Sequence, residues 1–194
     1  MIGLVILSFA TGCGNEPGGT AAEFKSLPAA AIPQAATEQQ VRIEPQNGAL
    51  LRMRIEMDGR TALMARMTNW DTIQTFLTAD PISFTLNDGR LVETRGLSFD
   101  LMSAEPGPPL AALKGGEVYL RRWQVIAAED AIRDIRLDCS AGVSHVNSAR
   151  HIEENCRGGE FSIVNRFVII SPQTLAWSRQ WIGPGGGYVV VQQP

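Results

Sequence analysis

Apolar and polar residues alternate along much of the chain after Gln40, and a period of two is typical of β-strands that bury one face. In the segment 51–57 the apolar residues take the odd positions, whereas Arg52, Arg54 and Glu56 take the even ones. Asp58-Gly59 then supplies a turn, and the segment 61–67 returns. This pattern predicts a hairpin with one face buried and the other in water.

The same arrangement recurs towards the C-terminus. Asn87-Asp88-Gly89 and residues 171–174 are turn sequences between apolar runs. The glycine-rich segment 183–187 is typical of a bend or bulge, and Asp71 is a candidate N-cap for a helical turn over 71–78. Further strands are expected at 82–86, 90–97, 117–126, 132–139, 161–170, 175–181 and 188–191. The pattern predicts a mainly antiparallel β-protein of about eight to twelve strands.

A short apolar run at residues 1–9 ends in Ala10-Thr11-Gly12-Cys13. Small residues that lead into a cysteine after such a run are typical of a bacterial lipoprotein signal, in which the cysteine is acylated and becomes the new N-terminus. No Lys or Arg precedes Lys25, although a secretory signal has a positive n-region, so we expect an abbreviated signal or a start further upstream. A buried N-terminal strand is the alternative, and Gly12 and Gly14 disfavour it. The run is too short for a transmembrane helix, which needs about 20 apolar residues.

Residues 14–40 are mostly Ala, Gly, Pro, Gln, Glu and Thr, a composition typical of a tether. Such a flexible segment has an end-to-end distance of about 30 Å. We therefore divide the chain into a lipoprotein signal peptide (1–12), a lipidated, disordered or partly helical tether (13–40) and a single β-rich domain (41–194).

The composition limits the classes of function. With 194 residues, of which 44% are hydrophobic and 19% charged, the chain is sufficient for one globular domain with a real core. Its net charge is −3 and its pI about 5.4, so it lacks the basic surface of a nucleic-acid-binding protein.

The three cysteines are expected to have two different roles. Cys13 is assigned to lipid, and Cys139 with Cys156 is expected to form a disulfide, because an even pair beyond a secretion signal favours an oxidising compartment. His145 and His151 lie between the two, so a zinc site is an alternative, as are reduced thiols. The spacing is unlike that of usual zinc knuckles, and we interpret the histidines as polar loop residues.

Sequence patterns of catalysis are missing. There is no Gly-x-Ser-x-Gly elbow, and the segment 183–187 lacks the Lys-Ser/Thr of a phosphate loop. Glu153-Glu154 and Glu129-Asp130 are adjacent pairs, which point to opposite faces of a strand, and we interpret them as solvated surface charge. The sequence therefore predicts a protein that is not an enzyme and needs no cofactor or metal.

Trp177, Arg179 and Trp181 share one face of a strand by the period of two. Aromatic rings beside an arginine can bind sugars, because the ring is apolar on its face and polar at its edge, so this face is a candidate glycan or partner surface. The alternative is that these rings pack in the core or at its rim.

Several segments together resemble the YjbF/GfcB family of lipoproteins, which are tied to exopolysaccharide and group 4 capsule production. The resemblance covers about residues 40–194 and rests on Cys13, Asn87 to Val92 with Thr94 and Gly96-Leu97, Pro109-Leu110, and Ser178 to Gly185 followed by an apolar strand. It implies an outer-membrane lipoprotein that faces the periplasm, with a β-rich, partly open barrel and no assigned catalytic residues. The expected fold is therefore all-β, either an antiparallel, partly open barrel or a strongly curved sandwich.

The leading hypothesis is a non-enzymatic lipoprotein, held to the membrane by its lipid, that supports polysaccharide assembly or export. Its partners would be polysaccharide-secretion proteins or the polysaccharide itself. Gly14, in place of Asp after the acylated cysteine, favours the outer membrane. Two alternatives are a half-open barrel that carries a lipid or acyl chain, supported by the apolar face of residues 51–57, and a glycan-modifying enzyme with carboxylates gathered in a cleft.

Overall fold

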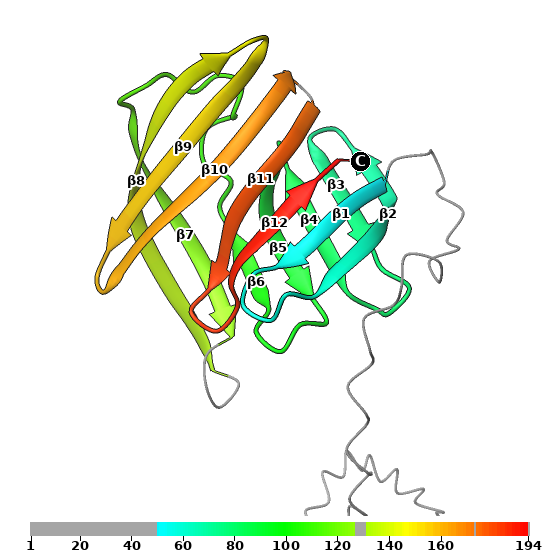
Figure 1. Cartoon of the computed structure of the whole chain (residues 1–194). Helices are drawn as coiled ribbons and strands as arrows, with labels where there is room; N and C mark the ends of the chain where they lie inside the picture. Colours follow the sequence, from blue (N-terminus) through cyan, green and yellow to red (C-terminus); the bar gives the residue numbers. More distant parts are fainter. Residues whose placement is uncertain (1–49, 127–130, 173, 194) are drawn as a thin grey trace, which may run out of the picture. The chain divides into compact units, whose positions relative to one another are not determined.

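The computed structural model describes residues 50–126, 131–172 and 174–193, and every regular element in these ranges is a β-strand (Figure 1). The strands are β1 (Leu50–Ile55), β2 (Thr61–Trp70), β3 (Ile73–Leu77), β4 (Ser83–Asn87), β5 (Arg90–Arg95), β6 (Leu101–Ala104), β7 (Val118–Ile126), β8 (Ile132–Val146), β9 (Ala149–Gly158), β10 (Phe161–Ser171), β11 (Thr174–Gly183) and β12 (Gly187–Gln192). The predicted all-β class is confirmed. The boundaries expected at residues 12, 13, 40 and 41 lie outside the described residues.

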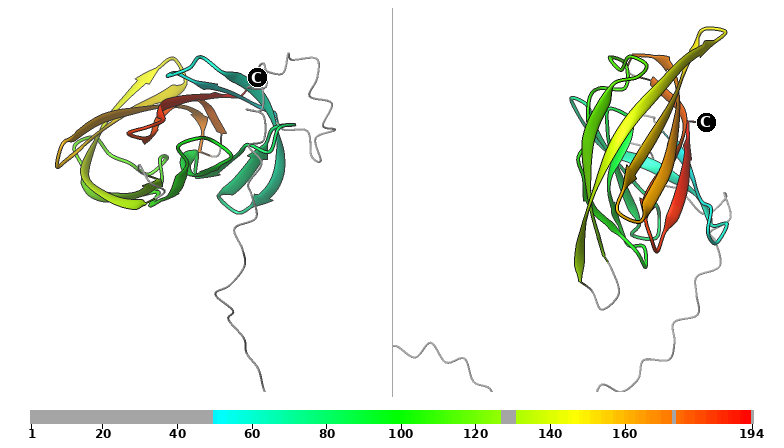
Figure 2. Two further views of the ribbon diagram at one scale, coloured as in Figure 1. Left: turned by 90° about the horizontal axis from the view of Figure 1, so that it is seen from below. Right: turned by 90° about the vertical axis from the view of Figure 1, so that its left-hand side faces the viewer.

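All twelve strands form one antiparallel sheet in the order β5-β4-β3-β2-β1-β12-β11-β10-β9-β8-β7-β6. The first and last strands of the chain's described part, β1 and β12, pair in the middle of this order. The edge strands β5 and β6 are consecutive in sequence and lie next to each other, so the sheet curls into a nearly closed barrel with one unsealed seam (Figure 2). The expected partly open barrel is confirmed.

Across this seam, hydrogen bonds from side chains take the place of backbone pairing between β5 and β6. The Thr94 hydroxyl donates to Asp100 Oδ1 at 2.9 Å and accepts the Leu101 N–H at 2.8 Å. The Arg95 guanidinium donates to the carbonyls of Leu101 and Met102 at 3.2 and 3.3 Å. An exposed sheet edge offers unpaired backbone groups to other chains, and these contacts satisfy part of the two edges at the seam.

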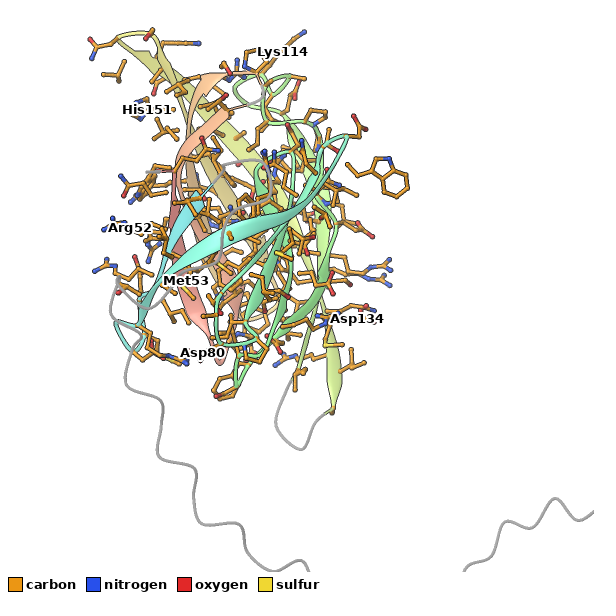
Figure 3. All side chains as sticks on the ribbon, turned by 90° about the vertical axis from the view of Figure 1, so that its right-hand side faces the viewer. Arg52, Met53, Asp80, Lys114, Asp134 and His151 are labelled. Carbon is orange, nitrogen blue, oxygen red and sulfur yellow. A yellow bond between two sulfur atoms is a disulfide. The ribbon has the colours of Figure 1, made fainter. Side chains whose placement is uncertain are left out.

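Two apolar clusters fill the barrel interior. Alternation decides which side chains enter it: Arg52 and Met53 are neighbours on β1, but only Met53 is buried (Figure 3). The larger cluster includes Met53, Phe84 and Trp123. The smaller cluster gathers Leu110 and Leu113, from the loop between β6 and β7, against the inner face of β8 to β11. That loop therefore acts as a plug at one end of the barrel.

Two local predictions were wrong. The helical turn expected over 71–78 is instead a hairpin, because Trp70 pairs with Ile73 and only Asp71-Thr72 turns the chain. Asp71 has a φ of 53°, and Asp tolerates this left-handed conformation in tight turns as well as it caps helices.

The polar loop expected around the two histidines is also wrong. β8 continues to Val146, which pairs with Ala149, so that a tight turn at Asn147 and Ser148 joins β8 to β9. Asn147 has a φ of 54°, which Asn adopts more easily than most residues. The long β8–β9 hairpin therefore carries both histidines on strands.

Candidate functional site

Segments that are far apart in the sequence meet at the plugged end of the barrel. The Leu110 N–H donates to the Asp88 carboxylate, and the Arg90 guanidinium donates to the Pro108 carbonyl. A Cβ atom on Gly89 would lie 3.4 Å from the side chains of Leu110 and Leu175. The turn between β4 and β5 is therefore held tightly against the plug.

Gln180, on β11, connects this turn to the strand across the barrel interior. Its Oε1 accepts the Leu91 N–H at 2.7 Å, and its Nε2 donates to the Gly89 carbonyl at 2.9 Å and to the Ser178 hydroxyl at 2.9 Å. Gln180 is 3% exposed, and from across the interior it satisfies one backbone group of the edge strand β5 and one of the turn that precedes it. Residues from three of the segments that carry the family resemblance, Gly89, Leu110 and Gln180, thus meet here.

A charged layer lies between the two apolar clusters. Glu154 is fully buried and accepts four hydrogen bonds: from Arg121 at 2.6 Å, Tyr119 at 2.7 Å, Asn165 at 2.8 Å and Arg90 at 3.3 Å. Both arginines are buried as well. Tyr119 packs against both clusters, which places the layer between them.

The electrostatics of this layer favour an ionised Glu154. Burial opposes its charge, but the guanidiniums of Arg121 and Arg90 outweigh that effect and hold the pKa of this carboxyl below its ordinary value of 4.5. Burial and the Glu154 charge raise the pKa of Tyr119, which remains a phenol donor. Burial lowers the pKa of Arg121 in spite of Glu154.

The prediction that Glu153 and Glu154 are both solvated surface charge is wrong for Glu154. The two residues do point to opposite faces of β9, and Glu153 forms an exposed ion pair with Arg166 at 2.9 Å. Glu154 instead faces the interior, where arginines from β5 and β7 neutralise it. The pair Glu129-Asp130 lies outside the described residues.

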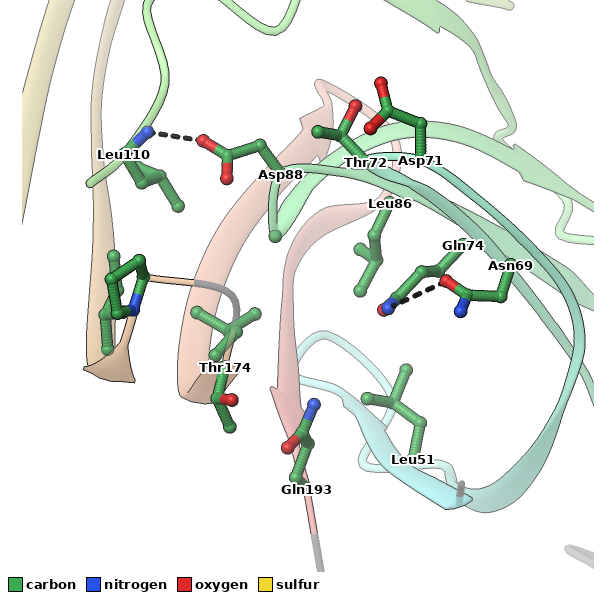
Figure 4. A pocket seen from close by; sticks show the side chains of 14 residues that line it. Leu51, Asn69, Asp71, Thr72, Gln74, Leu86, Asp88, Leu110, Thr174 and Gln193 are labelled. Atoms are coloured by element: carbon green, nitrogen blue, oxygen red, sulfur yellow. Dashed lines mark hydrogen bonds between the residues drawn. The ribbon is translucent and has the colours of Figure 1, made fainter. Parts of the chain in front are cut away.

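A cavity of about 440 Å³ opens at the mouth of the barrel beside the plug (Figure 4). Its polar lining comes from the β2–β3 hairpin and from the ends of β4, β11 and β12, and its apolar lining comes from leucines and one isoleucine. We call this the mouth cavity; it is lined by Leu51, Asn69, Asp71, Thr72, Gln74, Leu86, Asp88, Gly89, Leu110, Ile169, Pro172, Thr174, Leu175 and Gln193.

The structure does not bring the three residues of the expected glycan or partner surface together. Trp177 and Arg179 are half-buried on the outer face, but Trp181 is 6% exposed and its ring packs edge-on against Trp123 at 6.0 Å. The cause is local: β10–β11 pairing ends at Arg179, and the Trp181 N–H donates to the Asn165 side chain instead. Trp181 keeps its pairing with Tyr188 of β12, but on the β10 side it has left the ladder, and its ring lies in the core.

The outer face still has a groove beside Trp177. It measures about 460 Å³ and lies over β8 to β11, where Trp177, His151 and Arg166 contribute to its walls. Arg179 points away from it into a bidentate ion pair with Glu56, at 2.9 and 2.7 Å, and stacks on the Tyr188 ring. The outer groove is a second surface on which Trp177 could contact a ligand.

The expected Cys139–Cys156 disulfide is confirmed. It joins directly opposed residues of β8 and β9 whose side chains are fully buried. Within the described ranges no group of three or more potential metal-binding side chains comes together. Cys13 lies outside the described residues. Among those that are described, no helix is long and apolar enough to cross a bilayer.

Comparison with known proteins places the chain in a family. The profile of a family described as "Group 4 capsule polysaccharide lipoprotein gfcB, YjbF" matches residues 21–193. The chain belongs to the YjbF family. As a member of this lipoprotein family, it is associated with capsule polysaccharide production.

A solved structure supports the fold of this YjbF-family protein. The hypothetical lipoprotein YmcC from Escherichia coli (K12) superposes with a TM-score of 0.62 at 18% sequence identity, over 82% of this chain and 89% of that one. At this level of identity the likeness concerns the fold alone. No curated protein sequence matches the chain.

The filled interior argues against the lipid-carrier alternative. The apolar face of β1, which motivated it, is buried in the larger core cluster through Leu51, Met53 and Ile55. The glycan-modifying alternative requires carboxylates gathered in a cleft. Asp71 and Asp88 do line the mouth cavity, but the Asp88 carboxylate already accepts the Leu110 N–H.

Proposed function

We infer that this YjbF-family protein is a non-enzymatic lipoprotein, anchored through Cys13 in the outer membrane and facing the periplasm, that supports the assembly or export of an extracellular polysaccharide. The observation that carries the proposal is the family match over residues 21–193. The small residues before Cys13 and the Gly after it support the anchor and its membrane.

The arrangement of ionisable groups supports a binding role over a catalytic one. A catalytic acid or base must reach a substrate, and the most strongly interacting carboxylate, Glu154, is fully buried with four donors around it. The protein would act by holding a secretion protein or the polysaccharide itself. The mouth cavity and the outer groove are two hollows that could serve this purpose.

Deletion of the gene tests the proposal. We expect polysaccharide delivered to the cell surface to fall in the deletion strain and to recover when the wild-type chain is expressed from a plasmid. The purified chain should also leave the chain-length distribution of that polysaccharide unchanged after incubation. Unaltered amount and surface delivery in the deletion strain would remove the role, and shortened polysaccharide would replace it with an enzymatic one.

A further inference from the structure

The mouth cavity combines hydrogen-bonding side chains from separate hairpins. Asn69 and Gln74 face each other across the β2–β3 hairpin, and Gln74 Nε2 donates to Asn69 Oδ1 at 3.4 Å. This contact leaves the Asn69 amide nitrogen and the Gln74 carbonyl oxygen for a ligand. Thr174 and Gln193 add a hydroxyl and a third amide, from β11 and from the residue after β12 (Figure 4).

An apolar floor lies beneath these polar groups. Leu51, Leu86, Leu110 and Leu175 line the same cavity, and all four are buried in the core clusters. Ligand sites typically have volumes of about 300–1,000 Å³ and combine an apolar lining with a few placed polar groups. The mouth cavity, at about 440 Å³, has this size, and it is more polar than such sites because seven of its 14 lining residues are polar.

The charge of the lining restricts the class of ligand. Asp71 and Asp88 are its charged side chains, and no Lys, Arg or His is among its lining residues. A ligand with carboxylate or phosphate groups would meet like charge without a compensating cation. The cavity therefore suits an uncharged ligand that offers hydroxyl or amide groups at its edge and C–H groups on its face.

The rim near Asp88 is held in place before any ligand arrives. The Asp88 carboxylate accepts the Leu110 N–H, Gly89 packs against Leu110 and Leu175, and Gln180 fixes the backbone on both sides of Arg90. A binding surface that is already ordered loses less conformational entropy on association.

We propose that the mouth cavity binds uncharged sugar units, either neutral hexoses or N-acetylhexosamines, through the amides of Asn69, Gln74 and Gln193 and over the leucine floor. The sugar's hydroxyl and acetamido groups match the rim, and its C–H face matches the floor. This assignment rests on the proposed role in polysaccharide production, whose ligand it specifies.

Calorimetric titration of the full mature chain tests the assignment. The chain is purified in a detergent without a sugar headgroup and titrated with cellotetraose, maltotetraose, tetra-N-acetylchitotetraose and tetragalacturonate. We expect saturable binding of at least one uncharged tetrasaccharide and weaker or no binding of tetragalacturonate. Absence of binding by all three uncharged probes, or tighter binding of the acidic one, would overturn the assignment.

Paired amide substitutions locate the site. Asn69→Ala with Gln74→Ala removes two rim amides and should weaken binding at least about tenfold, as expected for two lost hydrogen bonds. Gln124→Ala with Asn155→Ala removes two half-buried amides from the outer faces of β7 and β9 and should leave affinity unchanged. Equal affinity in the rim variant, or loss of binding in Trp177→Ala instead, would place the sugar elsewhere.

The proposed role in polysaccharide production and the proposed sugar site can be disproved independently. If gene deletion reduces surface polysaccharide but no uncharged tetrasaccharide binds, the role in polysaccharide production stands and the mouth assignment falls. If the sugars bind at the rim but deletion changes nothing, the sugar site stands and the proposed role falls.

Discussion

The Glu154 carboxylate keeps two arginines inside the barrel, where their charges cost desolvation energy. A buried ion pair is not by itself stabilising relative to apolar residues, but removal of one partner leaves an uncompensated buried charge. Two guanidiniums share one carboxylate here. Each also stacks on an aromatic ring: Arg121 Cζ lies 4.4 Å from the centroid of the Trp123 ring, and Arg90 Cζ lies 5.7 Å from that of Phe167. Loss of Glu154 would therefore leave the desolvation energy of both arginines uncompensated.

Glu154→Gln should lower the free energy of unfolding by about 3–5 kcal/mol, because it removes the counter-charge and keeps the shape. Urea denaturation followed by tryptophan fluorescence measures the change. The matched control is Glu153→Gln, the next residue, whose half-exposed ion pair with Arg166 should contribute no more than about 1 kcal/mol. Similar effects of the two substitutions would mean that the charged layer does not brace the barrel.

Wild type and Glu154→Gln should also differ in how their free energies of unfolding depend on pH. Because the folded-state pKa of Glu154 is lowered from 4.5, its ionisation stabilises the fold above that pH, and this stabilisation is lost as the pH falls through the folded-state value. The gap in unfolding free energy between wild type and Glu154→Gln should therefore be full at neutral pH and shrink on acidification below 4.5. A gap that does not change with pH would count against an ionised Glu154.

The inward orientation of the buried charges could have been predicted from their positions in the alternating pattern. Arg121 has the same parity as Trp123 and Val125, and Glu154 has that of Ile152 and Cys156, so alternation alone places both on inward faces. Their partnership could not be predicted, because β5, β7 and β9 meet only when the sheet curls. Trp181 is the opposite case: alternation placed it outside, and the end of the β10–β11 ladder turned it inward.

At the scale of elements, hairpins with clear turn residues were predictable. Asp58-Gly59 and Asn87-Asp88-Gly89 joined strands as expected, because Asp, Asn and Gly accept left-handed backbone at low cost. Asp71 and Asn147 use the same conformation, but without a following Gly their turns were interpreted as a helix cap and a loop. β3, the far half of β8 and β9 were missed for that reason.

The disulfide stabilises the β8–β9 hairpin. Cys139 and Cys156 are separated by 17 positions, and a loop of about this length corresponds to about 3 kcal/mol of unfolding free energy in the chain-entropy treatment. Cys139→Ala with Cys156→Ala should lower the free energy of unfolding by about this amount, measured by urea denaturation of the oxidised wild type and the double variant. A change well below 1 kcal/mol would show that the β8–β9 ladder holds the hairpin without the bridge.

At the scale of the whole molecule, alternation predicted a β-protein, and the family resemblance predicted that it curls into a partly open barrel. The closing contacts are long-range: Gln180 reaches β5 across 89 positions, and Glu154 reaches Arg90 across 64. The mouth cavity could not be predicted, because its lining comes from three hairpin turns, the plug and the ends of β1 and β12, which are spread from Leu51 to Gln193. Only the closed barrel brings them together.

We propose that the protein acts through its position at the membrane as much as through its folded domain. The described residues form a braced barrel with a polar mouth. The proposed acylation of Cys13, in the segment before them, would hold this barrel at the membrane. A body that works by holding a sugar or a secretion protein needs to be present where the polysaccharide passes.

The most direct measurement is the amount of surface polysaccharide per cell in the deletion strain that expresses either the wild-type chain or the same body behind a cleavable, non-lipidated signal peptide in place of residues 1–13. Immunoblotting of the periplasm confirms that both bodies accumulate equally. The account predicts that the wild-type chain restores surface polysaccharide and that the soluble body does not. Full restoration by the soluble body would contradict it.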